Sequence, residues 1–301
     1  GHTRGVYRTT TRMREAVPGH PPVPNLAPQE VFPETQEVVP DRPVVRSSYD
    51  NDSVYLNSRD SWRLTASLPY LMGEFRWTGI DYLGESRWPA RATPSGLLDL
   101  AGFPKDQYYL YQSLWTKRPM VHLLPHWTHP GKEGVAIPVV AYSNAEEVEL
   151  FQDGRSLGRQ PMTLDWQIVW MVPFRPGILR AVAYRDGQPV AETTQRTAGP
   201  ARRLRLDLDR TTVSANRRDA VHATVTVVDA DGVPVPGAAN RITFSVRGPL
   251  RLLGTENGNV LDHTPAPSAA RDAFMGLCLG IYQATDQAGP VEITVSADGL
   301  E

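Results

Sequence analysis

The chain has 301 residues, a formal net charge of −2 at pH 7 and 21% charged side chains. This length allows two or three domains with a core in each, and the balanced charge gives no electrostatic reason to expect nucleic acid or an anionic membrane as a partner. The single cysteine, Cys278, excludes a disulfide within the chain, and no apolar run reaches the ~18 residues of a membrane span.

The first 130 residues mix irregular segments with a few regular elements. Residues 1 to about 40 are rich in proline, which excludes a long helix there. The patterns then predict short strands over Arg42–Asp50 and Leu68–Trp77. Gly102–Asp106 is expected to open a helix, with Pro104 in its first turn and an apolar face made of Tyr108, Tyr111, Leu114 and Trp115. Strand, long loop and helix together form one β/α unit of a barrel.

From about residue 135 the pattern changes to short strands separated by turn signals. Asp-Gly pairs between alternating segments are a strong hairpin signal, and they occur at Asp153–Gly154, Asp186–Gly187 and Asp231–Gly232. Repeated hairpins without helical periodicity predict two β-sandwiches, over residues 135–198 and 200–301, with Thr197–Pro200 as a linker. The expected fold class is therefore mixed, with residues 1–130 as a separate region.

The most informative stretch is Gly73–Glu85, in which a short apolar run leads into Trp77 and a loop with Asp81 and Glu85. An indole face can stack on the apolar face of a sugar ring, and a core tryptophan is the alternative interpretation. Asp81 and Glu85 either bind sugar hydroxyls or cap and cross-link their loop. Glu74 lies three residues before Trp77, on the opposite strand face, so we interpret it as structural.

The other candidates for chemistry carry less information. Asp99, which precedes the predicted helix, either bonds a sugar hydroxyl or braces its loop. Three histidines have the spacing of metal ligands on a helix, but Pro125 interrupts any helix there, so no metal site is predicted at His122, His126 and His129. Glu34 and Thr35 resemble part of a nucleophile strand, but the flanking proline and polar residues do not form a buried strand.

Several segments, in order along the chain, resemble family 2 glycoside hydrolases of the β-galactosidase type. They are His2–Tyr7, Gly73–Glu85, Leu97–Asp106 with Tyr108–Ser113, His122–Trp127 and Tyr142–Phe151. Asp207–Thr212 and Gly276–Leu279 resemble the invasin-like sandwich that follows in these enzymes. The resemblance covers essentially the whole chain. It implies the C-terminal strands and helix of a (β/α)8 TIM barrel, followed by two all-β immunoglobulin-like sandwiches.

The resemblance also implies a function. The enzyme would be a retaining hydrolase of terminal β-galactosyl or similar β-glycosyl residues in oligo- or polysaccharides. Both catalytic glutamates are expected upstream of Gly1, so this chain carries no catalytic residue and is expected to be inactive alone. Trp77 and Asp99 map to positions near the pocket for the cleaved sugar. The implied partners are the carbohydrate and the N-terminal portion of the same enzyme; no cofactor is implied, and a homo-oligomer stays open.

Two departures from the family pattern concern the substrate. Thr93–Ser95 precede Gly96 where relatives often carry an aromatic residue. The Asn-Lys pair with which glucuronidases bind a uronic carboxylate is not visible in Arg87–Gly96, which favours a neutral sugar, galactose first. Arg87 and Arg91 keep an acidic substrate, and hence β-glucuronidase-type specificity, open.

A second hypothesis is a non-catalytic carbohydrate-binding or structural module. In that case the sandwiches would make the contacts, with an aromatic platform formed by Trp127, Trp166 and Trp170. The chain begins with Gly and shows no signal peptide, which we interpret as a fragment or a processed chain. A periplasmic or secreted location is expected, and a cytoplasmic one stays open.

Overall fold

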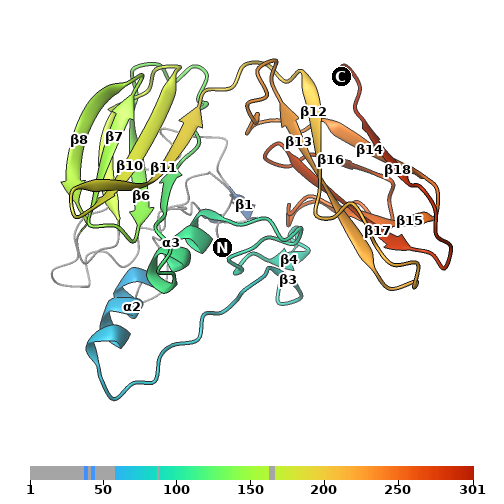
Figure 1. Ribbon diagram of the computed structural model, residues 1–301, viewed down its shortest axis with the longest axis horizontal. Helices are drawn as coiled ribbons and strands as arrows, with labels where there is room; N and C mark the ends of the chain where they lie inside the picture. The colour runs from blue at the N-terminus through green and yellow to red at the C-terminus, as the bar shows by residue number, and fades with distance from the viewer. Residues whose placement is uncertain (1–36, 40–41, 45–57, 87, 163–166) are drawn as a thin grey trace. The chain divides into compact units, whose positions relative to one another are not determined.

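The computed structural model describes residues 37–39, 42–44, 58–86, 88–162 and 167–301. The predictions for His2–Tyr7, Glu34, Arg87 and Trp166 lie outside those residues, as does most of the proline-rich region. The chain divides into two compact units (Figure 1). The first comprises Gly1–Asp81, Pro94–Leu98 and Pro104–Thr197, and the second comprises Tyr82–Thr93, Asp99–Phe103 and Ala198–Glu301.

In the described part of the chain, the first elements of the first unit are two short strands and a helix. β1 (Glu37–Val39) and β2 (Arg42–Val44) pair antiparallel, and α2 (Ser58–Ser67) follows. β1 forms at the end of the region that was expected to be irregular. β2 confirms the start of the strand predicted over Arg42–Asp50, whose remainder lies outside the described residues.

The strand predicted over Leu68–Trp77 is wrong. The segment is neither helix nor strand, and no described strand pairs with it. Met72 and Phe75 are fully exposed, and Tyr70 is largely exposed. An extended segment becomes a strand only when a neighbouring backbone takes up its hydrogen bonds, so an apolar run without a partner strand stays irregular.

The helix predicted after Gly102 is confirmed as α3 (Asp106–Trp115). Lys105 is its N-cap, so Pro104 precedes the helix and does not lie in its first turn. The predicted apolar face is wrong in part, because Leu110 and Tyr111 are buried whereas Tyr108 and Trp115 are exposed. The buried face also includes polar side chains, which hydropathy does not reveal: Asp106, Gln107 and Ser113.

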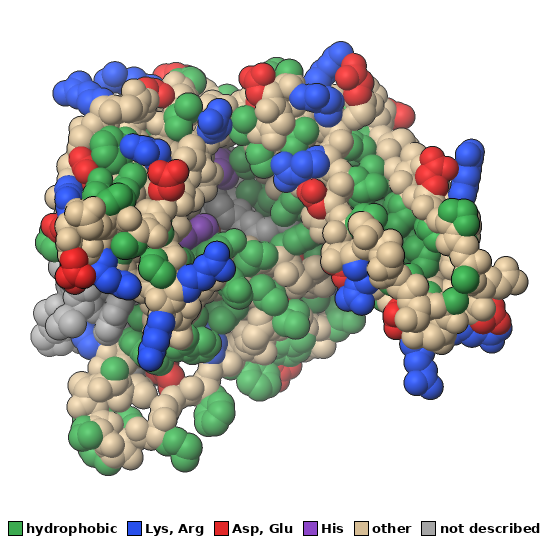
Figure 2. Space-filling view, viewed as in Figure 1, with side chains coloured by type: hydrophobic (Ala, Val, Ile, Leu, Met, Phe, Trp, Pro, Cys, Tyr) green, Lys and Arg blue, Asp and Glu red, His purple; other side chains and the backbone are tan. Residues whose placement is uncertain are grey.

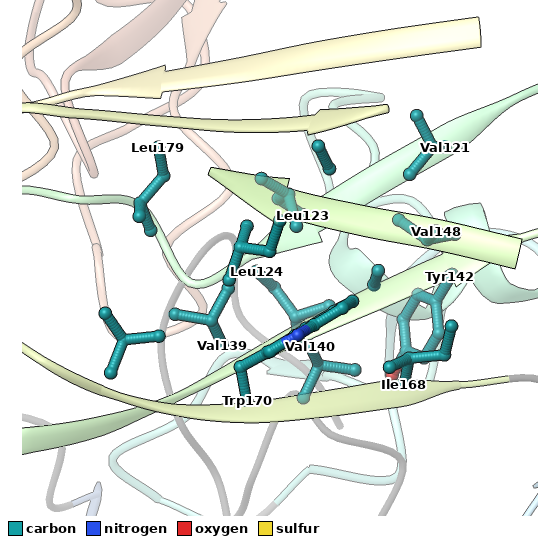
Figure 3. Packing of buried hydrophobic residues seen from close by; sticks show 14 of the residues in the cluster. Val121, Leu123, Leu124, Val139, Val140, Tyr142, Val148, Ile168, Trp170 and Leu179 are labelled. Carbon is teal, nitrogen blue, oxygen red and sulfur yellow. The ribbon is translucent and has the colours of Figure 1, made fainter. Parts of the chain in front are cut away.

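Beyond α3, the first unit is a sandwich of two antiparallel sheets. One sheet has the order β5 (Val121–Leu124), β6 (Ala136–Ser143), β9 (Ile168–Pro173). The other has the order β11 (Gln188–Arg196), β10 (Ile178–Arg185), β7 (Glu147–Gln152), β8 (Arg155–Pro161). Buried side chains from both sheets form one core, as Figure 3 shows for Leu123, Val139, Val148 and Leu179. α3 packs against β5 and β6, so β6 is buried along nearly its whole length.

Two of the three predicted Asp-Gly hairpins are confirmed. β7–β8 and β10–β11 are each joined by a two-residue loop whose Asp and Gly both have positive φ, 49° and 83° at Asp153–Gly154 and 50° and 73° at Asp186–Gly187. These angles belong to the turn type that matches strand twist. The third hairpin is wrong in its second arm: after Gly232 the chain makes only an isolated bridge at Pro234, because proline has no N–H for a ladder.

The second unit is a further sandwich of antiparallel strands. Its larger sheet has the order β12 (Arg203–Leu208), β13 (Ala220–Val228), β17 (Leu277–Ala284), β15 (Leu250–Glu256). Its smaller sheet has the order β16 (Ala270–Asp272), β14 (Arg241–Arg247), β18 (Glu292–Ser296). A separate apolar core includes Val225, Phe244 and Tyr282. The short hairpin β3 (Tyr82–Leu83) and β4 (Ala92–Thr93) belongs to this unit as well.

The surface carries both charge signs. On the face drawn in Figure 2, Lys and Arg side chains are interspersed with Asp and Glu over both units and do not gather into a patch of one sign. This distribution agrees with the charge balance of the sequence. Within the described part of the chain, no helix is both long enough and apolar enough to cross a lipid bilayer.

Candidate functional site

Trp77 lies at the start of a short ladder in the first unit. Thr78 N donates to Ser95 O at 3.3 Å, Leu97 N donates to Thr78 O at 3.1 Å, and Ile80 and Leu98 form a parallel bridge. The backbone beside Trp77 is therefore fixed although the preceding segment is irregular. Its side chain is 69% exposed, so the core interpretation of this tryptophan does not hold within the described residues. An exposed indole on an anchored backbone can offer a face to a sugar ring.

The buried side chain of Asp81 links the two segments of the same ladder. Its side chain is almost completely buried, and its Oδ1 accepts hydrogen bonds from Lys105 Nζ at 2.6 Å and Gly96 N at 2.7 Å. Burial raises the pKa of this carboxyl, and Lys105 counteracts the rise only in part. Residue 96 must be glycine, since a Cβ there would lie 2.2 Å from Asp81 N. The geometry favours the cross-linking interpretation of Asp81; direct sugar contact stays a prediction.

Asp99 has a similar role in the second unit. It is buried, and its Oδ1 accepts from Ala101 N at 2.9 Å and Phe103 N at 3.0 Å, which closes a tight loop. Its carboxylate also lies against Gly258, where a Cβ would come within 2.2 Å of Oδ2. These contacts favour the bracing interpretation, and a bond from Asp99 to a sugar hydroxyl stays untested.

Glu85 is the one predicted carboxylate that faces solvent. It follows β3, has a positive φ of 48°, and accepts a hydrogen bond from the hydroxyl of Tyr82. Thr93 Oγ1 donates to Gly84 O at 2.6 Å across the same hairpin. Glu85 thus has both a fixed backbone and an accessible carboxylate. Trp77 and Asp81 belong to the first unit, whereas Glu85 and Asp99 belong to the second.

The three histidines do not converge. His122 Nε2 lies 2.9 Å from Asp106 Oδ1, and its ring stacks on Tyr109 at 3.8 Å. His126 and His129 stack on each other at 4.5 Å. Burial lowers the pKa of His126 to about 3 and that of His129 to about 4, so both rings are neutral at physiological pH. Among the described residues, no group of three or more His, Cys, Asp or Glu is placed to hold a metal ion.

Other candidates are part of the fold. Glu74 accepts a hydrogen bond from Thr65 Oγ1 at 3.1 Å, in agreement with a structural role. Burial raises the pKa of the Cys278 thiol to about 12, which makes it a poor nucleophile. The aromatic platform of the second hypothesis is wrong for Trp127 and Trp170, because both are buried and donate their indole N–H groups to Arg175 O and Gly158 O.

Sequence reasoning missed a cluster in the second unit. Trp88 is 76% exposed and lies beside His263, with ring centroids 4.8 Å apart. Arg91 forms an ion pair with Glu256 at 2.6 Å. The partners lie far apart in the chain and no motif links them. Arg91 was considered only as a residue that could suit an acidic sugar, and Trp88, a tryptophan in a polar loop close after Trp77, was the signal that could have found the cluster.

Comparisons with known proteins give a consistent result. A family model described as glycoside hydrolase family 2 C-terminal domain 5 matches residues 204–301, and a domain of unknown function, DUF4982, matches residues 134–191. A putative β-glucuronidase of Formosa agariphila is 38% identical over 92% of this chain and 28% of its own length. β-Galactosidase BoGH2A of Bacteroides ovatus is 39% identical over 84% of this chain and 30% of its own length.

Solved structures agree with these matches. The crystal structure of a β-glycosidase from Bacteroides vulgatus superposes with a TM-score of 0.88 at 40% identity, and the match covers 100% of this chain and 39% of that one. A glycosyl hydrolase family 2 member from Bacteroides cellulosilyticus gives a TM-score of 0.73 at 31% identity, over 81% of this chain and 35% of that one. The chain therefore spans between 28% and 39% of the length of these four proteins.

Proposed function

The chain belongs to glycoside hydrolase family 2, as the C-terminal portion of such an enzyme, and we propose that the complete enzyme releases terminal β-galactosyl or similar β-glycosyl residues with retention. The relatives named β-galactosidase, β-glucuronidase and β-glycosidase support this proposal. Each of them is much longer than this chain, so we place both catalytic carboxylates in the remaining portion.

We further propose that residues 68–98 and α3 complete a (β/α)8 barrel whose other strands lie in that remaining portion. The parallel bridge between Ile80 and Leu98 supports this, because parallel pairing with a following helix is the arrangement of such a barrel. The exposed apolar residues Tyr70, Met72 and Phe75 support it as well, since neighbouring strands would bury them. The immunoglobulin-like class of both sandwiches is a proposal of the same kind.

The observation that carries the proposal is the exposed indole of Trp77 on an anchored backbone. In a barrel enzyme the residues at the ends of strands face the substrate. Trp77 would stack on the sugar that is released, while the buried pair of Asp81 and Lys105 fixes the loop that begins four residues later. Glu85 has the exposure needed to bond a hydroxyl, whereas Asp81 and Asp99 act as braces in this proposal.

The chemistry itself requires two carboxyl groups about 5–5.5 Å apart, one as nucleophile and one as acid and base. The nucleophile forms a covalent glycosyl-enzyme, which water then hydrolyses. The contribution of this chain is to hold the sugar ring and to exclude water from one side of it. The 301-residue chain alone is therefore expected to be inactive on chromogenic glycosides.

Replacement of Trp77 in the full-length enzyme tests the proposal. Trp77→Ala is expected to lower kcat/KM on a 4-nitrophenyl β-glycoside by about 100-fold, because it removes an aromatic stacking surface together with its buried area. Trp77→Phe should keep part of the activity. Trp115→Ala, which alters an exposed tryptophan of α3, is the matched control. Equal losses for Trp77→Ala and Trp115→Ala, or full activity of Trp77→Ala, would contradict the proposed role.

The sugar specificity calls for its own comparison. We propose galactose as the preferred sugar, because the Asn-Lys pair expected for a uronic carboxylate is not visible in Arg87–Gly96. The relatives' names include both β-galactosidase and β-glucuronidase, so the rates on 4-nitrophenyl β-galactoside and β-glucuronide decide between them. A periplasmic or secreted location also remains a proposal.

A further inference from the structure

The hairpin β3–β4 is fastened to one loop of the C-terminal sandwich. We name this loop, Glu256–Thr264, the clasp loop. Arg91 N donates to Val260 O at 2.9 Å, and Arg91 Nη2 donates to Glu256 Oε1 at 2.6 Å. His263 Nε2 lies 2.7 Å from Pro89 O. Since a carbonyl only accepts, His263 must carry its proton on Nε2 to make this bond. Three separate contacts therefore fix the connection between β3 and β4.

The clasp loop is itself held rigidly. Glu256 Oε1 also accepts from Asn257 N at 2.9 Å and Gly258 N at 3.2 Å. At the other end, the completely buried Arg271 donates to Asp262 at 2.7 Å and to Thr264 O at 2.9 Å. Charge-assisted bonds shielded from solvent are stronger than exposed ones. The loop is thus ordered before any ligand arrives, which lowers the entropic cost of binding.

The side chain that this arrangement presents to solvent is Trp88. Its indole is 76% exposed, and the ring of His263 lies beside it at 4.8 Å with an angle of 35° between the planes. The neighbouring Pro89 and Arg91 are the residues that the clasp loop binds. The chain beside a large exposed aromatic side chain is therefore fixed by polar contacts.

The surroundings of Trp88 distinguish it from the exposed apolar residues of the first unit. Met72 and Phe75 lie in an apolar run that pairs with no described strand, as expected for a surface that other protein covers. Trp88 instead lies beside the imidazole of His263, and its hairpin also carries the carboxylate of Glu85 and the ion pair of Arg91 with Glu256. An aromatic face with polar groups around it matches a pyranose, which has an apolar C–H face and a rim of hydroxyls.

We propose that Trp88 is a saccharide-stacking residue for a sugar of the substrate other than the one released, and that Glu256 and His263 are its positioning residues. The ligand class is a neutral hexopyranosyl unit of a β-linked oligosaccharide. This inference rests on the proposed glycosidase function. It gives the C-terminal sandwich a part in substrate selection, because its clasp loop determines where Trp88 stands.

The first test reads Trp88 directly in the full-length enzyme and does not depend on catalysis. Exposed tryptophans are oxidised with N-bromosuccinimide, with and without a β-linked galacto-oligosaccharide, and the peptide containing Trp88 is quantified by mass spectrometry. Trp88 is expected to be oxidised readily and to be protected at least fivefold by the oligosaccharide. A Trp88 that resists oxidation without sugar is covered by protein, and a Trp88 that the sugar does not protect is not a contact; either result overturns the proposal.

The second test is kinetic. Trp88→Ala should lower the ratio of kcat/KM on the oligosaccharide to kcat/KM on 4-nitrophenyl β-galactoside by about tenfold, mainly through KM, which is the effect of one lost stacking contact. Glu256→Gln and His263→Ala should lower the same ratio less. Glu292→Gln, which breaks the exposed ion pair with Arg247 in the same unit, should leave it unchanged. An unchanged ratio for Trp88→Ala overturns the proposal.

The two proposals fail in different ways. A full-length enzyme that hydrolyses neither β-galactosides nor β-glucuronides contradicts the proposed function, whereas the oxidation experiment still reports whether Trp88 contacts sugar. An active enzyme whose Trp88 is not protected retains the proposed function and loses only the second sugar contact. Partial recovery of the kinetic ratio in Glu256→Asp is expected for a positioning residue and not for a residue that only stabilises the fold.

Discussion

Strand β6 and the segment Leu68–Trp77 are both apolar runs, yet they occupy opposite environments. β6 pairs with β5 and β9, is covered by α3, and contributes Ile137, Val139 and Val140 to the core. The segment Leu68–Trp77 pairs with no described strand, and its Met72 and Phe75 are fully exposed.

Apolar side chains alone therefore do not decide whether a run is buried; its backbone also needs neighbouring strands. Both runs can bury apolar area, but among the described residues only β6 has a strand on either side. Burial of apolar surface yields roughly 25 cal/mol per Å², so an unburied run leaves a favourable free energy unused. The exposed segment is therefore the place where we expect the remaining portion of the enzyme to pack.

The largest effect on stability is expected from breaking the buried ion pair of Asp81 and Lys105, which lies just after the exposed segment. Lys105→Met leaves the Asp81 carboxyl buried without its partner, and we expect it to destabilise the first unit by about 3–5 kcal/mol. Urea unfolding followed by tryptophan fluorescence measures this, because six of the seven tryptophans of the sequence lie in the first unit. The double variant Asp81→Leu with Lys105→Met should recover much of the loss. A cost below about 1 kcal/mol for Lys105→Met would contradict the pairing.

An intermediate effect on stability is expected when the pH falls, because of two histidines in the first unit. His126 and His129 have folded pKa values of about 3 and about 4, lowered from 6.5 mainly by burial. Between those values and 6.5 the unfolded chain binds more protons than the folded chain, so stability falls as pH falls from about 6.5 towards 4. At pH 5 we expect a loss on the order of 2 kcal/mol, with His126 discounted for its partial exposure.

Thermal unfolding at pH 7 and at pH 5 measures that loss. His129→Gln removes one of the two titrating groups and should flatten the dependence of Tm on pH, whatever its effect on Tm at pH 7. His222→Gln is a suitable control because His222 is solvent-exposed and lies in the other unit, beside Asp209. A wild-type stability that stays constant from pH 7 to pH 5 would show that the two rings titrate normally.

Local signals in the sequence predicted the parts of the fold that local geometry decides. The turns Asp153–Gly154 and Asp186–Gly187 were predictable because their residue types suit positive φ, and the flanking strands alternate. The arm after Gly232 was not, because Pro234 outweighs the turn signal that precedes it. The start of α3 was predictable from Gly102–Asp106, but its buried face was not, since Gln107 and Ser113 are buried polar residues.

The candidate site was predictable only where one residue type carries the chemistry. Trp77 was identified because few side chains stack on sugars, and its exposure agrees with that role. For Asp81 the sequence left a sugar ligand and a loop cross-link as alternatives, because the burial that separates them depends on Lys105, 24 residues away. Arg91 and Glu256 are separated by 165 residues, so no spacing rule applies to the clasp loop.

The smallest effect is expected for a substitution in the exposed segment, and it tests most directly the difference between this segment and β6. Phe75→Ala in the 301-residue chain should change the free energy of unfolding by less than about 0.5 kcal/mol, because the fully exposed ring loses no contacts. Ile137→Ala, at the first buried position of β6, should cost about 2–5 kcal/mol in the same chain.

In the full-length enzyme the two substitutions should have similar costs in the free energy of unfolding, because neighbouring barrel strands would enclose Phe75. Phe75→Ala should then cost about 3–5 kcal/mol, whereas the cost of Ile137→Ala should not change. Chemical denaturation of both variants in both lengths of the protein measures the four values. If Phe75→Ala were equally harmless in the full-length enzyme, the exposed run would not be the surface on which the rest of the barrel packs. A surface other than the rest of the barrel would then have to cover Leu68–Trp77.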